Sequence, residues 1–523
     1  MKNTIKYFTV AALTSVGIAC TNLDEKLPGQ YTAQADVTNV GYGISFTESP
    51  PARPADGLQT AYNQLLSGIA TNGGFFAVQE GGTDEAVITQ KGGDWYDGGL
   101  YIRIHRHEFS SQTWAINDVW NQAYNGIFQC NDLMNGKNII ANITPSQTAQ
   151  LRFLRAFFHW RLMEVFGNVK IITTAGVDAP QKSRAEVYAF IENEVLAVLP
   201  DLPTGKVYGR ATQMAAHAFL SRFYLNAGVY TGTTQYQKAI NEADAVISSG
   251  LYNLGANYAN VFSYDNSMNA DAAAEIIWTI PFNEATDQGA TWHCETLHYP
   301  SQLTYNFTDQ PWNGFSTLED FYNAYSDDDK RKAANFIVGQ QYASDGTTPL
   351  LDLAFTKGYP NGANLNYTPK INELEPNAWR AGGARFGKFK FKMGARTNDD
   401  NDFPLFRYGE VLLNKAEAMQ RLSGTWTDDG GARSLVNQIR TRAGTTPFAS
   451  MTEVDMLAER GRELFIEAIR RTDMIRFGTY TTASWWEHTP GALDGSGYTK
   501  LMAIPNEQLN AGQTYQLTQN PGY

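Results

Sequence analysis

Residues 91–99 combine aromatic and polar side chains in the manner that sugar binding requires. Trp95 and Tyr96 stand between Asp94 and Asp97, and paired glycines flank these four residues. An aromatic face can lie against the C–H bonds of a sugar ring, while carboxylates and amides bind its hydroxyl groups. A segment of this composition cannot bury both rings locally. We therefore predict an exposed loop on which Trp95 stacks against a sugar and Asp94 or Asp97 fixes its hydroxyl groups.

Two further segments are candidates for the same role. Trp292 and His293 lie in a polar stretch that continues to Tyr299, and Trp312 follows a proline and precedes an Asn-Gly pair. We expect Trp292 to supply a second stacking surface. Trp312 equally suits a structural role ahead of the charged turn at residues 329–331, and both interpretations stay open.

A hydrolase is the main alternative, and the sequence gives it little support. A glycosidase needs two carboxyl groups held roughly 5–10 Å apart, one of them with a raised pKa. The chain has 53 acidic residues, so neighbouring pairs such as Asp84 and Glu85 arise easily by chance. The sequence has no Gly-x-Ser-x-Gly elbow of the serine hydrolases. We interpret the protein as a binding protein and not an enzyme, with glycoside hydrolase as the less favoured class.

Metal binding also lacks a clear sequence pattern. His105 and His107 alternate as they would on a strand, and no third ligand stands near them in sequence, which favours a hydrogen-bonded pair over a metal site. Residues 398–402 are rich in Asn and Asp but lack the spacing of an EF-hand. We expect Cys130 and Cys294 to be two buried free thiols rather than a disulfide. The sequence predicts no metal and no cofactor.

The N-terminus has the plan of a lipoprotein leader. Lys2 and Lys6 begin it, and the apolar run that follows ends at Cys20 and is too short to span a membrane comfortably. Cleavage before Cys20 makes residues 1–19 a signal peptide and leaves a cysteine for acylation, although Gly17 stands where such sites usually have leucine. A plain signal peptide is the alternative. The net charge of −12 disfavours nucleic acid as a partner.

Helical periodicity dominates the chain on both sides of a less regular stretch. Apolar residues recur every three or four positions in residues 58–66, 114–133, 145–167, 184–196, 212–227, 236–247, 404–422, 432–442 and 453–477. Thr144 and Ser183 have the residue types that cap helix starts. Residues 251–403 are instead rich in Gly, Asn, Asp and Pro, with short strands predicted at 275–280 and 386–393. Four tryptophans within periodic patterns are expected in the core: Trp114, Trp120, Trp160 and Trp278.

Several of these segments, in their order along the chain, resemble the SusD/RagB family. The matching segments are Leu151 to Val169, Gly209 to Gly228, Tyr236 to Tyr252, Phe406 to Ala418, Glu459 to Phe477 and Leu517 to Tyr523. Any one of these motifs alone is weak, whereas the ordered set is specific. The sequence departs from the family pattern at Ile469-Arg470, where the family usually has a Gly-x-Arg, and at Gly17.

The resemblance implies a mainly α-helical, SusD-like scaffold with tetratricopeptide-like helix pairs and an irregular, loop-rich region that faces the ligand. It implies one SusD-like domain over residues 20–523. Within it, residues 57–250 form the N-terminal helical scaffold, 251–403 the loop-rich excursion, and 404–523 the C-terminal helices and tail. The family places its sugar-stacking aromatics just after a segment like residues 83–85, which favours Trp95.

The resemblance also implies a place in the cell and partners. Members of this family are lipid-anchored proteins on the surface of the outer membrane in Bacteroidetes, and Asp24 and Glu25 behind Cys20 fit that pattern. They capture oligosaccharides for polysaccharide utilization, or peptides in the RagB branch, and deliver them to a SusC-type TonB-dependent transporter. We therefore expect an oligosaccharide ligand and a SusC-type partner, with the peptide ligand left open.

Overall fold

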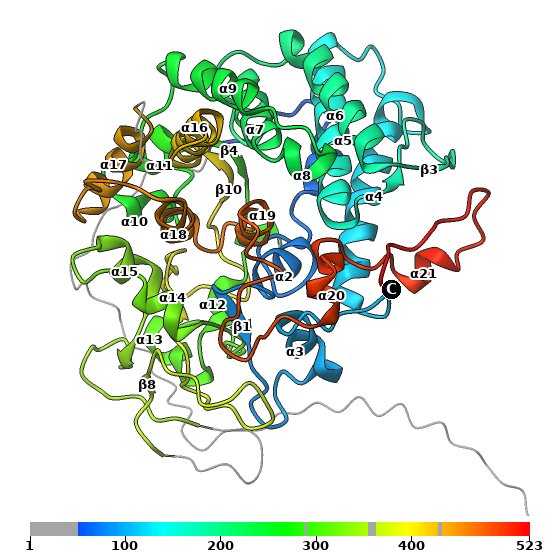
Figure 1. Ribbon diagram of the computed structural model, residues 1–523. Coiled ribbons are helices and arrows are strands. Elements are labelled where there is room, and N and C mark those ends of the chain that lie inside the picture. Colours follow the sequence, from blue (N-terminus) through cyan, green and yellow to red (C-terminus); the bar gives the residue numbers. More distant parts are fainter. Residues whose placement is uncertain (1–50, 287–289, 354–361, 427–430) are drawn as a thin grey trace, which may run out of the picture. The chain divides into compact units, whose positions relative to one another are not determined.

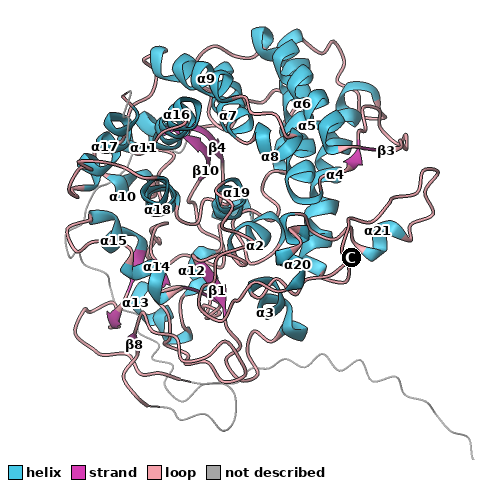
Figure 2. Cartoon of the chain, viewed as in Figure 1, coloured by secondary structure: helices cyan, strands magenta, loops and turns pink. Residues whose placement is uncertain are grey.

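The computed structural model describes residues 51–286, 290–353, 362–426 and 431–523 (Figure 1). The predicted signal peptide and Cys20 lie outside this described part. Within it, helices predominate over strands (Figure 2), which confirms the mainly α-helical prediction. Among the described helices, none combines the length and the apolar character that crossing a membrane requires.

The long helices of the N-terminal scaffold begin where the sequence provides caps. Helix α4 (Trp114–Asn135) and helix α6 (Arg184–Val198) both pack against α5 (Pro145–Phe166). The Thr144 side chain accepts from the Gln147 N–H, and the Gln147 side chain accepts from the Thr144 N–H. Ser183 and Glu186 form the same reciprocal pair before α6. Each cap satisfies backbone N–H groups that a helix start leaves unpaired, so both predicted starts are confirmed.

The C-terminal helices return to this scaffold. Helix α9 (Tyr236–Ser248) packs against both α7 (Gln213–Leu225) and α16 (Tyr408–Ser423), and the green and orange ribbons of these helices lie together in Figure 1. Helices α17 (Ala432–Ala443) and α18 (Glu453–Leu464) pack against α16 in turn. Helices from both sides of the loop-rich excursion therefore pack against one another, in keeping with the helix pairs that the family resemblance implies.

The remaining helices are short. They are α1 (Gln59–Asn63), α2 (Gly74–Glu80), α3 (Leu100–His105), α8 (Ala227–Thr231), α10 (Tyr258–Val261), α11 (Ala270–Glu275), α12 (Trp292–Thr296), α13 (Gln302–Tyr305), α14 (Glu319–Asn323), α15 (Lys330–Asn335), α19 (Arg470–Arg476), α20 (Ala492–Gly495) and α21 (Asn506–Leu509). Many of them fall between residues 251 and 403, where loops connect them (Figure 2). The described part of this stretch therefore consists of short elements joined by loops.

Strands occur as antiparallel pairs. In the described ranges, β1 (Ala86–Ile88) pairs with β5 (Phe315–Thr317), β2 (Val169–Lys170) with β3 (Gln181–Lys182), β4 (Ile276–Ile280) with β10 (Phe403–Arg407), β6 (Phe336–Ile337) with β9 (Arg385–Phe386), and β7 (Gly339–Gln340) with β8 (Asn366–Tyr367). The β1–β5 pair matters most for function, because it joins the chain just before residues 91–99 to the chain just after Trp312.

Buried charges join the C-terminal helices to the loop-rich region. The Glu463 carboxylate on α18 contacts three guanidinium groups, with Arg407 at 2.6 Å, Arg331 at 2.9 Å and Arg442 also in contact. Although burial opposes ionisation, these three cations hold the pKa of Glu463 well below its usual range. A charge so deep in the protein is tolerated because it is fully paired.

Three element predictions were wrong at their edges. Residues 403–407 form β10, so the predicted helix at 404–422 begins only at Tyr408. The predicted strand at 386–393 ends at Phe386, because the Lys388 and Lys390 ammonium groups turn inward and donate to backbone carbonyls. The segment with His105 and His107 is helix α3 and a turn, not a strand, and His107 has a left-handed backbone with φ of 58°.

The core predictions were mostly right. Trp120, Trp160 and Trp278 are buried, and Cys130 and Cys294 are buried free thiols. The prediction for Trp114 was wrong, because this first residue of α4 is 45% exposed. A helix end presents side chains to solvent even when the periodic pattern continues into it.

Candidate functional site

Three loops meet around residues 90–99. The Gln90 N–H donates to the Leu374 carbonyl (2.9 Å), and the Gly92 N–H donates to the Pro376 carbonyl (2.9 Å). The Lys91 ammonium group donates to the Gly314 carbonyl (3.2 Å). Residues 90–99 therefore lie between residues 312–314 on one side and residues 372–380 on the other.

Lys91 is the buried connection among these loops. Burial, helped by the positive charge of Arg385, holds the pKa of the Lys91 ammonium group well below its usual range. Its Nζ lies 3.2 Å from the carbonyl oxygens of both Thr89 and Gly314. The bond to Gly314 crosses to the loop after Trp312, so Lys91 fixes the base of the Trp95 loop.

Trp95 is held firmly by its edges. Its Nε1–H donates to the Trp312 carbonyl (2.5 Å), and its ring meets Tyr101 edge-on at 5.7 Å between centroids. The ring also covers Gly314, where an added Cβ would lie 2.6 Å from it. Trp95 has a left-handed backbone, with φ of 60°. The loop is therefore less open than predicted, because the Trp95 ring is half-buried and held in a fixed orientation.

Of the residues next to Trp95 in sequence, two have exposed side chains and one forms a hydrogen bond to a distant loop. Tyr96 is 50% exposed and Asp97 is exposed, as the sequence predicted. Asp94 instead accepts a hydrogen bond from the Tyr299 hydroxyl group. Burial and the Asp94 carboxylate both raise the pKa of Tyr299, so its hydroxyl group stays protonated and remains the donor. The structure thus brings Tyr299, from the second predicted segment, to the first.

Two exposed tryptophans lie on the loops next to the Trp95 loop. Trp312 is 38% exposed and Trp379 is 51% exposed. The Arg385 guanidinium group connects their segments, since it donates to the Asn313 side chain (2.9 Å) and to the Arg380 carbonyl. The structure therefore groups Trp95, Trp312 and Trp379 on neighbouring loops.

Sequence reasoning missed Trp379. It follows Pro376, Asn377 and Ala378 and precedes a Gly-Gly pair, which is the same mixture of turn residues and tryptophan that singled out residues 91–99. That composition was the signal that could have found it. The loop position of Trp379 is fixed by its backbone N–H, which donates to the Asn372 side chain (2.7 Å).

A polar cluster lies beside the aromatic loops. Asp352 Oδ1 is 2.7 Å from His298 Nε2 and 2.8 Å from Arg380 Nε. Burial opposes ionisation of Asp352, but these two neighbours hold its pKa below the usual value. The carboxylate is therefore ionised and engaged as an acceptor, and Arg380 lies next to Trp379 in sequence. A sugar bound to the aromatic rings would find both charges nearby.

Trp292 and His293 are not part of this surface. Trp292 is 1% exposed, stacks on Phe389 at 5.4 Å and meets Phe76 edge-on at 4.6 Å. His293 is buried and its Nε2 bonds the Arg396 carbonyl (2.7 Å). The expectation that Trp292 offers an open stacking surface was wrong. Helix α2, which supplies Phe76 and which the sequence did not reveal, packs the ring into the core.

Glu295 lies below the aromatic loops. Burial raises its pKa to about 7, although the Asn72 N–H and the hydroxyl groups of Thr71 and Thr291 oppose the rise. Its backbone carbonyl accepts from the Gly314 N–H (2.9 Å). Glu295 thus holds Gly314, the residue that the Trp95 ring covers. Its own side chain is buried and does not reach the surface.

Comparison with known families shows to which protein family the chain belongs. The model of the SusD family matches residues 252–523, which is just over half of the chain. The chain belongs to the SusD family. A second model, described as starch-binding associating with outer membrane, matches residues 77–225, which include the Trp95 loop.

Individual SusD-family members agree with this assignment. The starch-binding protein SusD of Bacteroides thetaiotaomicron is 29% identical over 426 residues, which cover 73% of each chain. Among solved structures, surface glycan-binding protein A from Bacteroides uniformis has a TM-score of 0.69 at 22% identity. It aligns over 89% of this chain and 98% of its own. A laminarin-binding SusD-like protein aligns over the same shares with a TM-score of 0.68 at 21% identity. At these identities the structural likeness shows the SusD-like fold.

Proposed function

We propose that this SusD-family protein captures oligosaccharides on the rings of Trp95, Tyr96, Trp312 and Trp379 and does not cleave them. The grouping of these rings on neighbouring loops beside Asp352 and Arg380 carries the proposal. Exposed aromatic side chains in such positions tend to dominate binding energy. The names of the relatives, starch-binding, glycan-binding and laminarin-binding, support a glucan-like ligand.

The state of the nearby carboxylates favours binding over hydrolysis. A glycosidase acid must hold a proton, which requires a raised pKa. Asp352 has a lowered pKa, and Asp94 is already committed to the Tyr299 hydroxyl group. Asp352 is therefore suited to accept hydrogen bonds from sugar hydroxyl groups rather than to donate a proton to a leaving oxygen.

The binding role predicts a selective effect of Trp312→Ala. We expect affinity for maltooligosaccharides or laminarin oligosaccharides, measured by titration calorimetry, to fall by about tenfold, or roughly 1.4 kcal/mol. The ring is partly exposed and its carbonyl rather than its side chain holds Trp95, so we expect the melting temperature to change little.

Trp114→Ala is the matched control, because Trp114 is similarly exposed but begins α4 and makes none of the contacts described for the site. It should leave affinity unchanged. The same oligosaccharides should be recovered intact after incubation with the protein. Turnover at an ordinary enzymatic rate, or binding to a peptide panel without binding to any glycan, would show that the proposed function is wrong.

The cellular role rests on the family and on the N-terminal sequence. A lipid anchor on Cys20 would hold the protein at the outer surface of the outer membrane, where captured oligosaccharides pass to a SusC-type TonB-dependent transporter. The family description of association with the outer membrane supports this location. The basic residues and apolar run that end at Cys20 support the anchor.

Cys20→Ala tests the anchor. Because acylation needs the thiol, we expect the wild type in the membrane fraction and the variant in the soluble fraction, as seen by immunoblotting. Cys130→Ala, which removes a buried free thiol, should stay with the membranes. From gently solubilised wild-type membranes a barrel protein of the transporter class should copurify. Wild-type protein in the soluble fraction would refute the anchor, and a clean pull-down without a barrel protein would refute the partner.

A further inference from the structure

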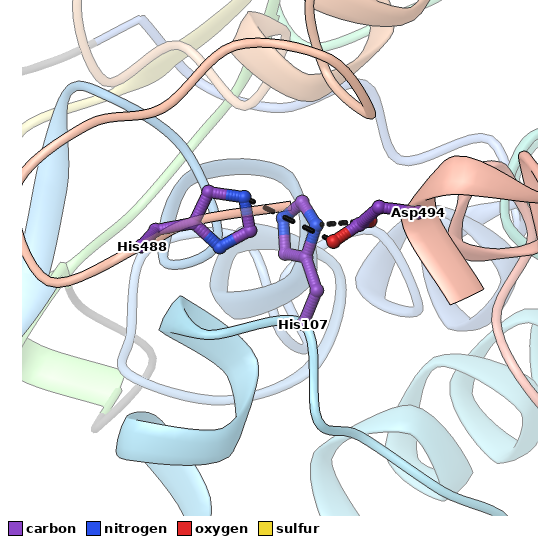
Figure 3. Close-up of side chains that lie close together, drawn as sticks. All are labelled: His107, His488 and Asp494. Carbon is purple, nitrogen blue, oxygen red and sulfur yellow. Dashed lines mark hydrogen bonds and ion pairs between the residues drawn. The ribbon is translucent and has the colours of Figure 1, made fainter. Parts of the chain in front are cut away.

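A buried cluster of two histidines and an aspartate lies apart from the aromatic loops. His107 follows α3, Asp494 belongs to α20, and His488 lies in the loop before α20 (Figure 3). His107 Nδ1 lies 2.8 Å from Asp494 Oδ1, and His488 Nε2 lies 4.0 Å from Asp494 Oδ2. One donor atom from each of the three residues lies within 4.8 Å of the others. Figure 3 shows the three side chains pointing toward one another.

Unsatisfied polar atoms surround this cluster. Among the described residues, neither ring nitrogen of His488 makes a hydrogen bond of standard geometry, although the side chain is fully buried and the ring faces the Arg106 backbone. Its ring stacks on Trp485 at 3.8 Å, and the Trp485 Nε1–H also lacks a partner. Buried polar groups are nearly always paired with protein, water or an ion. The unpaired His488 nitrogens therefore indicate a ligand between His488, His107 and Asp494.

The other atoms of the cluster are arranged as outer supports of a metal site. His107 Nε2 lies 3.0 Å from the Gly82 carbonyl, which leaves Nδ1 directed at Asp494. The Asp494 carboxylate accepts from the Gly491 N–H (3.1 Å) and from the Thr499 hydroxyl group. Metal-bound histidines usually donate their second ring N–H to a carbonyl, and metal-bound carboxylates are hydrogen-bonded in turn.

The donor set and its size fit zinc. Zinc is bound by imidazole nitrogen and carboxylate oxygen at about 2.0–2.2 Å in tetrahedral geometry, which places neighbouring donor atoms roughly 3.3 Å apart. The two His–Asp separations of 2.8 Å and 4.0 Å bracket that value, and all three donor atoms lie within 4.8 Å of one another. The side chains must shift for all three donors to reach one ion.

We propose that His107, His488 and Asp494 bind one zinc ion, with a water molecule as the fourth ligand. The ion joins the segment around α20 to the turn after α3. Because α3 directly follows residues 97–99, the metal stabilises the chain on which the aromatic loop is built.

The test uses the full chain purified without a histidine tag and stripped with a chelator. After addition of equimolar zinc chloride and desalting, we expect one zinc ion per chain by mass spectrometry of the metal and a higher melting temperature. His488→Gln and Asp494→Asn should each weaken zinc binding by at least about tenfold. His217→Gln is the matched control, since it removes a histidine from a His–carboxylate pair, His217 with Glu242 at 2.6 Å, elsewhere in the chain. It should retain the zinc.

His488→Gln decides the question if Asp494→Asn misfolds, because the His488 ring makes no hydrogen bond of standard geometry with the described residues and so should contribute less to folding than Asp494 does. Circular dichroism of the metal-free proteins confirms that they are folded. The proposal is overturned if the wild type retains no zinc, as expected for a cluster that holds only water. It is equally overturned if His488→Gln retains zinc as tightly as the wild type.

Discussion

Glu463→Gln is expected to lower the free energy of unfolding by about 3–5 kcal/mol, measured by denaturant titration. Glu463 is fully buried and its carboxylate lies against Arg331, Arg407 and Arg442. Glutamine has nearly the same shape but removes the negative charge, so positive charge is left uncompensated in a buried region. Removing one partner of a buried ion pair lowers the free energy of unfolding strongly, because the other charge is left buried without a partner. Replacing both partners by apolar residues often has little effect.

The effect should depend on pH in one direction. The folded-state pKa of Glu463 is lowered from 4.5, so its stabilisation is complete above pH about 4.5 and is lost progressively as pH falls toward the folded-state pKa. The difference between wild type and variant should shrink accordingly in acid. Glu453→Gln is the control, because Glu453 is half-exposed and pairs with Arg421 at 3.3 Å. It should cost less than about 1 kcal/mol. Equal losses in the two variants would contradict the burial argument.

Trp95→Ala is expected to weaken oligosaccharide binding by at least about tenfold and to lower the free energy of unfolding by about 1–3 kcal/mol. The sequence alone predicted little effect on stability, because it suggested an open loop. The structure changes that expectation, since the ring covers Gly314, meets Tyr101 and donates to the Trp312 carbonyl. Calorimetric titration and thermal unfolding measure the two effects on the same samples.

Trp95→Phe separates the two roles of this residue. Phenylalanine keeps an aromatic face for the sugar but has no N–H, so the Trp312 carbonyl loses its donor. We expect the stability loss to be about 1 kcal/mol and the affinity loss to be smaller than in Trp95→Ala. If Trp95→Ala binds oligosaccharides as well as the wild type does, the ring serves only as a support. The binding surface would then centre on Trp312 and Trp379.

Local sequence signals predicted the helical scaffold well. The caps at Thr144 and Ser183 satisfy helix N–H groups through residues three positions away, so they can be recognised without knowledge of the fold. The segments that carry the family resemblance also have a structural explanation. Arg407, Glu463 and Asp473 lie in these motifs and in the buried ion network, which tolerates few substitutions because each charge needs its partner.

The site was only partly predictable, because exposure depends on contacts between distant segments. Composition predicted the exposure of Tyr96, which the structure confirms, whereas the binding role of the loop around Trp95 stays a prediction. Composition could not distinguish Trp292 from Trp379, since both stand among polar and turn-forming residues. The first is covered by Phe76 and Phe389, which are more than 90 positions away in sequence, and the second has no such cover and is half-exposed. Likewise, His107 meets its partners only because the C-terminal segment folds back onto α3.

The internal hydrogen bond of the Trp95 indole has a consequence for selectivity among sugars. Because its N–H is already satisfied by the Trp312 carbonyl, the side chain can offer a ligand only its face. A face recognises the C–H side of a sugar ring, which depends on which hydroxyl groups are axial, but it makes no directional bond to an individual hydroxyl group. Under the proposed function, directional recognition of single hydroxyl groups then falls to groups such as Asp352 and Arg380 on the adjoining loops. Those loops can diverge during evolution and redirect the protein to another polysaccharide while the tryptophan stays unchanged.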